Sequence, residues 1–299
     1  MKKLVLGTVQ LGLDYGINNK KGKPSLEEAY SILDMAYQND ISILDTAAAY
    51  GDSEEIIGKY MKDTNRRFKI ATKLKPLKKH KNIESIIESE IKDSLRRLNV
   101  SSIDYYYLHN FKDVFENPSI LNILDRFKDK GLIKKAGISI YDTEELDYII
   151  NNLSGLIDIV QIPFNIFDLR WINSGLLDKA KKTGLMIFAR SIYLQGLIFC
   201  DKETADKIHP KLYGHITKLQ KFCEVNNISL DQAAMGFAKQ QGEIDYIIIG
   251  CDTQEHIING VKNFNSQKIE LEKKLYNFAF DNFKNIDKVI IDPRLWAKV

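Results

Sequence analysis

The sequence predicts an α/β fold, a closed (β/α)8 barrel (TIM barrel) with an extra C-terminal helix. Three observations predict it: eight short β-rich runs alternate with longer segments of helical period, most of these runs are almost continuously apolar, and no Pro-, Gly- or Ser-rich linker divides the 299 residues. Parallel strands buried on both faces have this apolar character. Barrels commonly reach about 250 residues or more as one domain. We therefore expect a single barrel domain over residues 1–299.

The expected strands alternate with helical segments along the whole chain. Their residues are 3–9, 42–46, 68–74, 103–109, 135–139, 158–163, 185–190 and 245–250. The run Ile247-Ile248-Ile249 shows the apolar character most plainly.

The segments between these runs carry helix signals. Ser25, which is followed by the acidic residues Glu27 and Glu28, is typical of a helix N-cap. Ile83–Leu98 has isoleucine and leucine at steps of three and four, which predicts one buried stripe. A last helix is expected at about 266–284. The longest stretch without a period, 192–211, is expected to be a functional loop such as a lid or a ligand belt.

An open, doubly wound sheet is the alternative fold, because it also alternates strands and helices. Such a sheet often carries a glycine-rich GxGxxG turn after its first strand. Here residues 7–12 read GTVQLG, which lacks that spacing. The barrel is therefore the better interpretation.

The composition excludes several classes of protein. With 44% hydrophobic residues, the chain can bury a core, which excludes a disordered protein. Its 43 basic and 40 acidic residues give a net charge of +3, so there is no electrostatic case for binding nucleic acid. Cys200, Cys223 and Cys251 are scattered, which argues against a zinc site or a disulfide scaffold, so no metal is expected.

The chain start and its apolar segments bear on location. Residues 1–7 carry a basic pair, but their apolar run is too short for a signal peptide. No apolar segment is long enough to span a bilayer. Free cysteines suit a reducing compartment. We therefore expect a soluble cytoplasmic protein that does not bind membranes and is a monomer or a homodimer.

Four ionisable residues follow three neighbouring strands. Asp45 and Tyr50 come after the second strand, Lys73 ends the third and His109 ends the fourth. Each alone has a structural explanation, such as a turn cap or a packed aromatic ring. Together they would converge at the carboxyl end of the barrel, where barrel enzymes have their active sites. Such clusters of ionisable groups concentrate in active sites.

These residues stand in recognisable motifs. Residues 44–54 read LDTAAAYGDSE and closely resemble the DTAxxYGxSE signature of the aldo-keto reductases. The segments ATK at 71–73 and IDYYYLH at 103–109 resemble the next two active-site strands of that family. The resemblance continues through 137–139, 160–165 and 191–197, and covers the chain from Leu6 to about Gly260.

The resemblance implies NAD(P)H-dependent reduction of a carbonyl, with Asp45, Tyr50, Lys73 and His109 as the catalytic tetrad. Hydride transfer leaves negative charge on the carbonyl oxygen, which needs a proton donor. Tyr50 would be that general acid, and the Lys73 ammonium would lower the pKa of its phenol. Asp45 would orient Lys73, and His109 would donate to the substrate oxygen or share in the proton relay.

The resemblance also implies a set of cofactor-binding residues. These are Thr8, Ser139, Gln161, Asn165, Ser191, Leu194, Gly196, Leu197, Gly250 and Asp252. Ser139 and Gln161 would bind the nicotinamide carboxamide. Ile140 stands where many relatives have Asn, so one carboxamide contact is missing or is supplied by Asn165. The loop at 191–197 would offer backbone N–H groups to the pyrophosphate.

Asp252 stands where many relatives have a basic residue for the 2′-phosphate of NADP(H). A carboxylate there would repel that phosphate and suit a 2′-hydroxyl, as in other NAD sites. The other interpretation is that Asp252 merely caps the helix that begins at Thr253. NADP(H) is expected first, because most of the family uses it, with NAD(H) as the alternative.

The substrate is expected to be a small carbonyl compound. The opening LGTVQLG at 6–12 resembles that of bacterial relatives thought to act on sugars or polysaccharide precursors. Arg170 and Arg190 would suit an anionic substrate only if they face the barrel mouth.

Two other functions are weighed against the reductase. One is a cofactor-binding regulatory or sensor subunit, since channel-associated subunits share this fold and tetrad. Turnover of aldehydes would exclude it. The other is an aldolase or isomerase with Lys73 as a Schiff-base nucleophile, which borohydride trapping would reveal.

Overall fold

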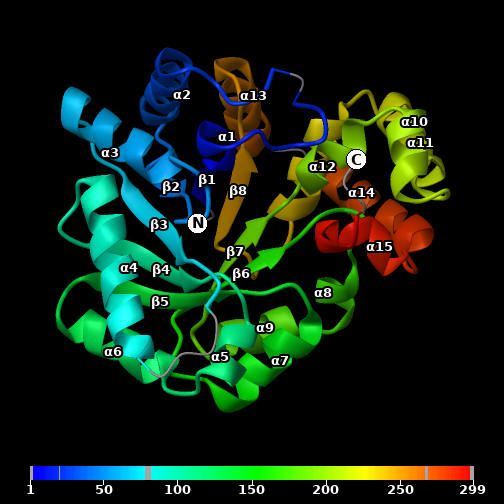
Figure 1. Ribbon diagram of the computed structural model, residues 1–299. Coiled ribbons are helices and arrows are strands. Elements are labelled where there is room, and N and C mark those ends of the chain that lie inside the picture. The colour runs from blue at the N-terminus through cyan, green and yellow to red at the C-terminus, as the bar shows by residue number, and fades with distance from the viewer. Residues whose placement is uncertain (1–2, 20, 78–81, 267–268, 297–299) are drawn as a thin grey trace.

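Eight parallel strands form a closed barrel at the centre of the protein (Figure 1). The computed structural model describes residues 3–19, 21–77, 82–266 and 269–296. Each strand pairs with the next one, and β8 pairs with β1 to close the cylinder. The strands are β1 Lys3–Gly7, β2 Ile43–Asp45, β3 Lys69–Leu74, β4 Ile103–Leu108, β5 Ile133–Ser139, β6 Ile159–Pro163, β7 Met186–Arg190 and β8 Tyr246–Gly250. The predicted (β/α)8 barrel is confirmed.

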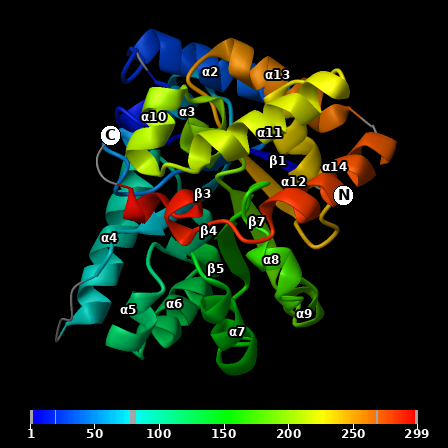
Figure 2. The same ribbon diagram turned by 90° about the vertical axis from the view of Figure 1, so that its right-hand side faces the viewer.

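Helices surround this barrel on the outside (Figures 1 and 2). They are α1 Val9–Gly12, α2 Leu26–Gln38, α3 Ser53–Thr64, α4 Ile83–Leu98, α5 Lys112–Glu116, α6 Ile120–Asp129, α7 Thr143–Asn152, α8 Arg170–Asn173, α9 Leu176–Lys182, α10 Lys202–Ile208, α11 Leu212–Val225, α12 Leu230–Lys239 and α13 Gln254–Asn265. Ser25 caps α2 in a capping box with Glu28, as its sequence predicts.

The strands alternate between an inner and an outer face. One cluster of side chains fills the barrel interior and comes from every second residue: Val5, Ile43, Ala71, Tyr105, Tyr107, Ile159, Phe188 and Ile248. The residues between them, such as Leu44 and Ile249, join the larger core between strands and helices. Because side chains on a strand alternate with a period of two, the inner face continues toward the carboxyl ends of the strands. It therefore continues into polar residues at the mouth, and these build the site.

The stretch 192–211 differs from its expectation as one non-periodic loop. It contains a 3₁₀ segment, η1 Leu194–Phe199, which is interrupted by non-helical backbone at Gln195 and Gly196, and the α-helix α10. The Asp201 side chain caps α10 by accepting from the backbone N–H of Thr204. A kinked 3₁₀ segment and a helix of seven residues leave no long periodic pattern, which explains why the sequence reads as a loop.

The C-terminal segment has more helices than the single one expected at about 266–284. The helix α14, Ile269–Phe283, corresponds to that expectation, whereas residues 267 and 268 lie outside the described residues. A short helix α15 (Lys288–Ile291) and a 3₁₀ turn η2 (Pro293–Leu295) follow. In Figure 2 this segment lies beside α10, and the His209 ring is 3.8 Å from Asp287.

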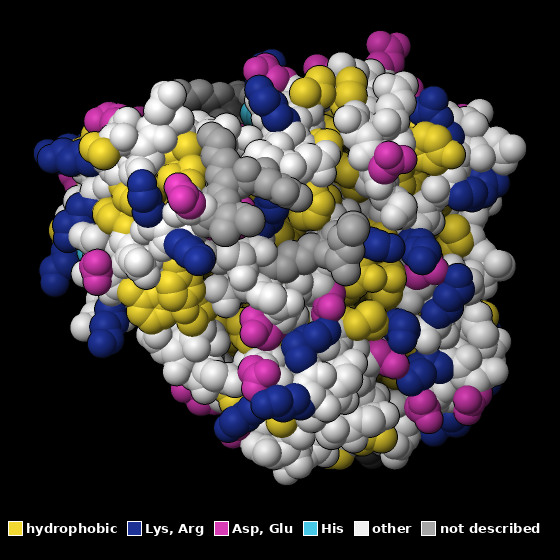
Figure 3. Space-filling view, turned by 180° about the vertical axis from the view of Figure 1, so that it is seen from behind, with side chains coloured by type: hydrophobic (Ala, Val, Ile, Leu, Met, Phe, Trp, Pro, Cys, Tyr) yellow, Lys and Arg dark blue, Asp and Glu magenta, His cyan; other side chains and the backbone are white. Residues whose placement is uncertain are grey.

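Basic and acidic side chains are interspersed on the face shown in Figure 3. That face therefore has no extended field of one sign. Among the described residues, no helix has the length and apolar character needed to cross a bilayer.

Candidate active site

A buried ion pair joins the ends of β2 and β3. The Lys73 ammonium lies 2.7 Å from the carboxylate of Asp45, and their side chains are 1% and 6% exposed. Lys73 also donates to the carbonyl oxygen of Thr46 at 2.9 Å. Both residues continue the inner face, two positions beyond Ala71 and Ile43. Burying either charge alone would be costly, so each fixes the position of the other.

The second carboxylate oxygen of Asp45 has a partner from another part of the barrel. Gln161, at the inner face of β6, donates to it from Nε2 at 2.7 Å. Its amide oxygen Oε1 is buried, and no residue in the described part of the chain donates to it. Gln161 is thereby oriented by Asp45 and presents a free acceptor.

Tyr50 is held at the mouth by close backbone packing. Gly12 of α1 and Gly51 approach so closely that a Cβ on Gly51 would overlap the Gly12 carbonyl oxygen. Gly51 also has φ +54°, a conformation that glycine adopts without steric cost. The Tyr50 ring centroid lies 5.1 Å from the Lys73 ammonium nitrogen. It lies 6.0 Å from the His109 ring centroid, with the rings nearly perpendicular. All four predicted tetrad residues therefore lie together.

Burial dominates the protonation of this cluster. It raises the pKa of Tyr50 above its ordinary value, as does Asp45, whereas Arg190 opposes this shift. Burial lowers the pKa of Lys73, and Asp45 opposes that shift. Burial, helped by Lys73 and Arg190, lowers the pKa of His109 to about 3. Loss of hydration therefore shifts the pKa of the phenol in the direction opposite to the one expected from Lys73. At neutral pH Tyr50 is a protonated phenol and His109 a neutral imidazole.

A cavity of about 800 Å³ opens above this cluster. Its volume is in the range of small-molecule and cofactor sites. Besides the tetrad, it is lined by most of the predicted cofactor residues: Thr8, Ser139, Gln161, Ser191, Gly196, Gly250 and Asp252. Thr8 donates to the Asp45 carbonyl oxygen and accepts from Ser53, so its hydroxyl is already engaged.

Three predicted cofactor residues do not line the cavity. Leu194 and Leu197 are buried in the hydrophobic core, and the Leu194 N–H donates to the Ser191 carbonyl oxygen at 2.8 Å. Asn165 is also buried, and its Oδ1 accepts from the backbone N–H of Phe167. The Leu194 N–H and Asn165 Oδ1 are therefore engaged within their own loops, whereas Asn165 Nδ2 is buried and has no acceptor among the described residues.

The loop after β7 is tightly wound and covered by another loop. Ser191, Leu194, Gln195 and Gly196 all have positive φ. The loop after β1 lies against it, because Asn18 donates to the Gly196 carbonyl oxygen at 2.6 Å. The Ile17 N–H donates to the Gln195 carbonyl oxygen at 3.1 Å. These bonds join two loops across one side of the cavity.

Asp252 lies at the cavity wall in an ion pair with His256. Hydrogen bonding to His256 lowers the pKa of Asp252, and the same bond raises the pKa of His256. The N-cap of α13 is Thr253, whose hydroxyl accepts from the backbone N–H of His256. The interpretation of Asp252 as that cap is therefore wrong.

Several cavity residues escaped the sequence analysis. Tyr141 and His256 line the cavity, although the sequence analysis gave neither a role. Arg190 also lines it, and had been assigned to an anionic substrate only on the condition that it faces the mouth. The signals existed: Arg190 and Tyr141 continue the inner faces of β7 and β5, and His256 lies one helical turn after Asp252. Arg170 does not line the cavity and is ion-paired with Asp168 and Asp142.

Known proteins resemble this chain over most of its length. The model of the aldo/keto reductase family matches residues 3–277. Aldo-keto reductase YhdN of Bacillus subtilis (strain 168) is 29% identical over 186 residues, 59% of this chain and 54% of YhdN. D-arabinose 1-dehydrogenase of Saccharomyces cerevisiae is 24% identical over 288 residues, 87% of this chain and 82% of that protein.

A solved structure has the same architecture. The aldo-keto reductase AKR11C1 from Bacillus halodurans, in its holo form, superposes with a TM-score of 0.75 at 19% identity. The superposition covers 99% of this chain and 95% of that one. At this identity the likeness shows the fold.

Proposed function

Since its residues 3–277 match the family model, this chain belongs to the aldo/keto reductase family, and we propose that it reduces an aldehyde or ketone to an alcohol with Tyr50 as general acid. The family consists of oxidoreductases that act on carbonyls with NAD(P)H. One observation carries the proposal: the Tyr50 phenol lies beside the buried Lys73–Asp45 ion pair and the His109 ring at the floor of a large cavity.

In this proposal the tetrad donates one proton to the substrate and stabilises the negative charge that develops. The Tyr50 hydroxyl donates its proton to the carbonyl oxygen as negative charge develops there. The Lys73 ammonium, 5.1 Å from the Tyr50 ring centroid, stabilises the phenolate that remains. Asp45 holds Lys73 in place, and neutral His109 hydrogen-bonds the substrate oxygen.

The cavity residues fit a nicotinamide dinucleotide. The buried amide oxygen of Gln161 has no donor among the described residues. Ser139 is the last residue of the neighbouring strand β5 and is paired in register with Gln161. A carboxamide supplies the N–H donor that Gln161 Oε1 needs. When bound, the dinucleotide supplies the hydride. Ser191, Gly196 and Gly250 line the remainder of the cavity, and NADP(H) is proposed first with NAD(H) as the alternative.

The cofactor preference is expected to depend on pH through His256. Below its raised pKa, imidazolium balances the Asp252 carboxylate; above that pKa, Asp252 is left as an unbalanced negative charge. A 2′-phosphate at this end of the cavity is then repelled. We expect the affinity for NADPH, relative to NADH, to fall about tenfold as the pH rises from about 6 to about 9. Calorimetric titrations of both cofactors across that range measure it.

Two variants make this measurement specific. His256→Gln should keep the affinity for NADPH relative to NADH low at every pH, and Asp252→Asn should keep this relative affinity high. If the affinities for NADPH and NADH changed with pH in the same way in the unmodified protein, the assignment of the Asp252 end of the cavity to the 2′-phosphate would be contradicted.

The proposed function is tested by turnover. An aldehyde panel that includes D-arabinose and other sugars is incubated with NADPH and with NADH, since one relative is named a D-arabinose 1-dehydrogenase. Oxidation of cofactor that depends on the aldehyde supports the reductase. Tight cofactor binding without turnover on any aldehyde would instead favour the regulatory or sensor subunit. Borohydride trapping at Lys73 would favour a Schiff-base enzyme.

A further inference from the structure

Arg190 is a basic residue of the cavity that the tetrad does not use. It ends β7 on the inner face, two residues beyond Phe188, and lines the cavity. Its charge opposes the rise in the pKa of Tyr50 and contributes to the lowered pKa of His109. The guanidinium therefore belongs to the same cavity as Tyr50 and His109, which are proposed to act on the carbonyl.

Among the described residues, this guanidinium contacts neutral groups. It donates to the Ile140 carbonyl oxygen at 3.2 Å and to the Ser191 hydroxyl at 3.4 Å. It stacks on the Tyr141 ring, with Cζ 4.2 Å from the ring centroid. Within the described part of the chain, no carboxylate oxygen comes within 4 Å of its nitrogens.

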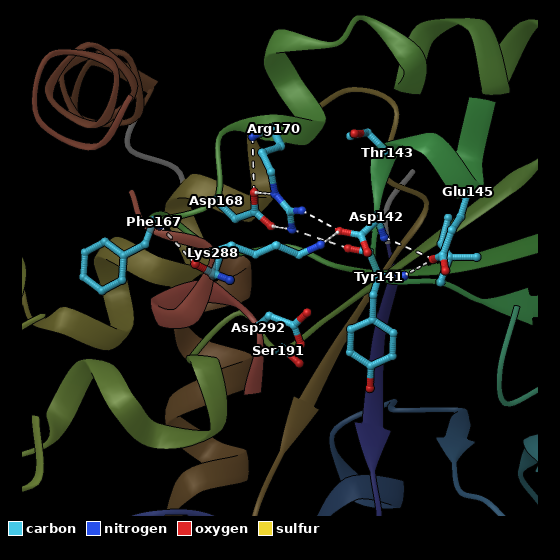
Figure 4. A network of polar contacts seen from close by, with 12 residues as sticks. Tyr141, Asp142, Thr143, Glu145, Phe167, Asp168, Arg170, Ser191, Lys288 and Asp292 are labelled. Carbon is cyan, nitrogen blue, oxygen red and sulfur yellow. Dashed lines mark hydrogen bonds and ion pairs between the residues drawn. The ribbon is translucent and has the colours of Figure 1, made fainter. Parts of the chain in front are cut away.

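Asp45 and Asp142, two acids near the mouth, are already in ion pairs. Asp45 binds Lys73 and Gln161. Asp142 accepts from Arg170 at 2.8 Å and from Lys288 at 2.7 Å, as Figure 4 shows.

The same network holds Arg190 in position. The Tyr141 ring, which points away from the Asp142 contacts in Figure 4, also contacts Arg294, whose Cζ is 3.7 Å from its centroid. Arg294 is itself bound by Asp292 at 2.6 Å. Two guanidinium groups therefore pack against one ring, and the anchored C-terminal segment contributes to the shape of the cavity.

Arg170 provides an internal comparison. It has two carboxylate partners, Asp168 and Asp142, and lies outside the cavity. An arginine of that kind serves the structure. A partly buried arginine that faces a cavity without a counter-ion instead favours an anion as its partner.

We infer that Arg190 binds a negatively charged group of the substrate, so that the preferred substrates are carbonyl compounds that carry a carboxylate or a phosphate. The inference rests on the proposed carbonyl reduction and deepens it. The planar guanidinium donates two parallel hydrogen bonds to either group. The anion at Arg190 would fix the orientation of the carbonyl toward Tyr50.

The test compares matched substrates. 4-Formylbenzoate and 4-formylbenzamide have nearly the same shape and differ in charge, whereas glyceraldehyde 3-phosphate differs from glyceraldehyde by its whole phosphate group. Arg190→Gln should lower kcat/KM about 10- to 100-fold for the charged member of a pair and less than about threefold for the neutral one. The pair that shows the selective loss identifies carboxylate or phosphate as the anion. Equal losses within both pairs, or no loss, would overturn the inference.

A control variant and a binding measurement complete the test. Arg126→Gln removes an exposed guanidinium on α6 that is paired with Glu84, and should change neither substrate pair. Calorimetric Kd values for NADPH should be the same for Arg190→Gln and the unmodified protein. A weaker Kd for NADPH and NADH would assign Arg190 to the cofactor phosphates and would overturn the inference.

Failure of the proposed function is recognised separately. If the protein reduces no aldehyde, binding of 4-formylbenzoate and 4-formylbenzamide to the NADP⁺-loaded protein still tests Arg190. Binding of the carboxylate about tenfold more tightly, and its loss in Arg190→Gln, would support the anion site. Equal affinity for both compounds would refute it.

Discussion

Replacing Tyr50 with Phe is expected to lower kcat for aldehyde reduction by about 10²- to 10⁴-fold. The variant removes the proton donor and leaves the ring, which packs near Lys73 and His109. The charge that develops on the carbonyl oxygen then has no adjacent acid. Cofactor affinity should stay within about threefold, because the dinucleotide is assigned to other residues. Steady-state rates and calorimetric Kd values measure the two quantities.

Tyr107→Phe is the matched control. Tyr107 is also a buried phenol, on β4, but it lies in the barrel interior and does not line the cavity. Its hydroxyl has no partner among the described residues, so its removal should leave the rate nearly unchanged. If Tyr50→Phe kept more than about a tenth of the activity, Tyr50 would not be the general acid.

Replacing Lys73 with Met is expected to abolish reduction and to lower the free energy of unfolding by about 3–5 kcal/mol. The ammonium is almost fully buried, and its removal leaves the Asp45 carboxylate buried without a counter-charge. The phenolate formed at Tyr50 also loses its stabilising cation. Urea unfolding followed by circular dichroism, together with turnover, measures both effects.

The double variant Asp45→Asn/Lys73→Met separates stability from catalysis. It removes both charges, and the amide oxygen of Asn can still accept from Gln161, which now donates at 2.7 Å. We expect unfolding free energy to return to within about 1 kcal/mol of the unmodified protein while turnover stays lost. If the double variant were as unstable as Lys73→Met, loss of the ion pair would not be the cause of the lowered free energy of unfolding.

The fold could be predicted because barrel strands have a local signature. Runs such as Ile247-Ile248-Ile249 are apolar on both faces, and the order of strands in a barrel follows the chain. The convergence of Asp45, Lys73 and His109 was predictable for the same reason, since the carboxyl ends of parallel strands meet at one rim. Their catalytic roles stay predictions.

The loop residues were less predictable. Leu194 and Leu197 were expected to offer backbone N–H groups to the pyrophosphate; their side chains pack into the core, and the Leu194 N–H donates to the Ser191 carbonyl oxygen. Asp252 was weighed without its partner His256. A loop has no fixed period that tells which side chains point inward, so its orientation depends on what packs against it.

The sequence by itself determined the eight-stranded barrel, the family and the gathering of the tetrad at one end, because a period of two and strand order are local properties of the chain. Only the tertiary structure decided that the Tyr50 phenol is less acidic than usual, since burial depends on every segment that covers it. It also decided that Arg190 faces the cavity while Arg170 pairs with Asp168 and Asp142. One of the two counter-ions of Arg170, Asp142, lies 28 residues away in the sequence, which is beyond the reach of a local pattern.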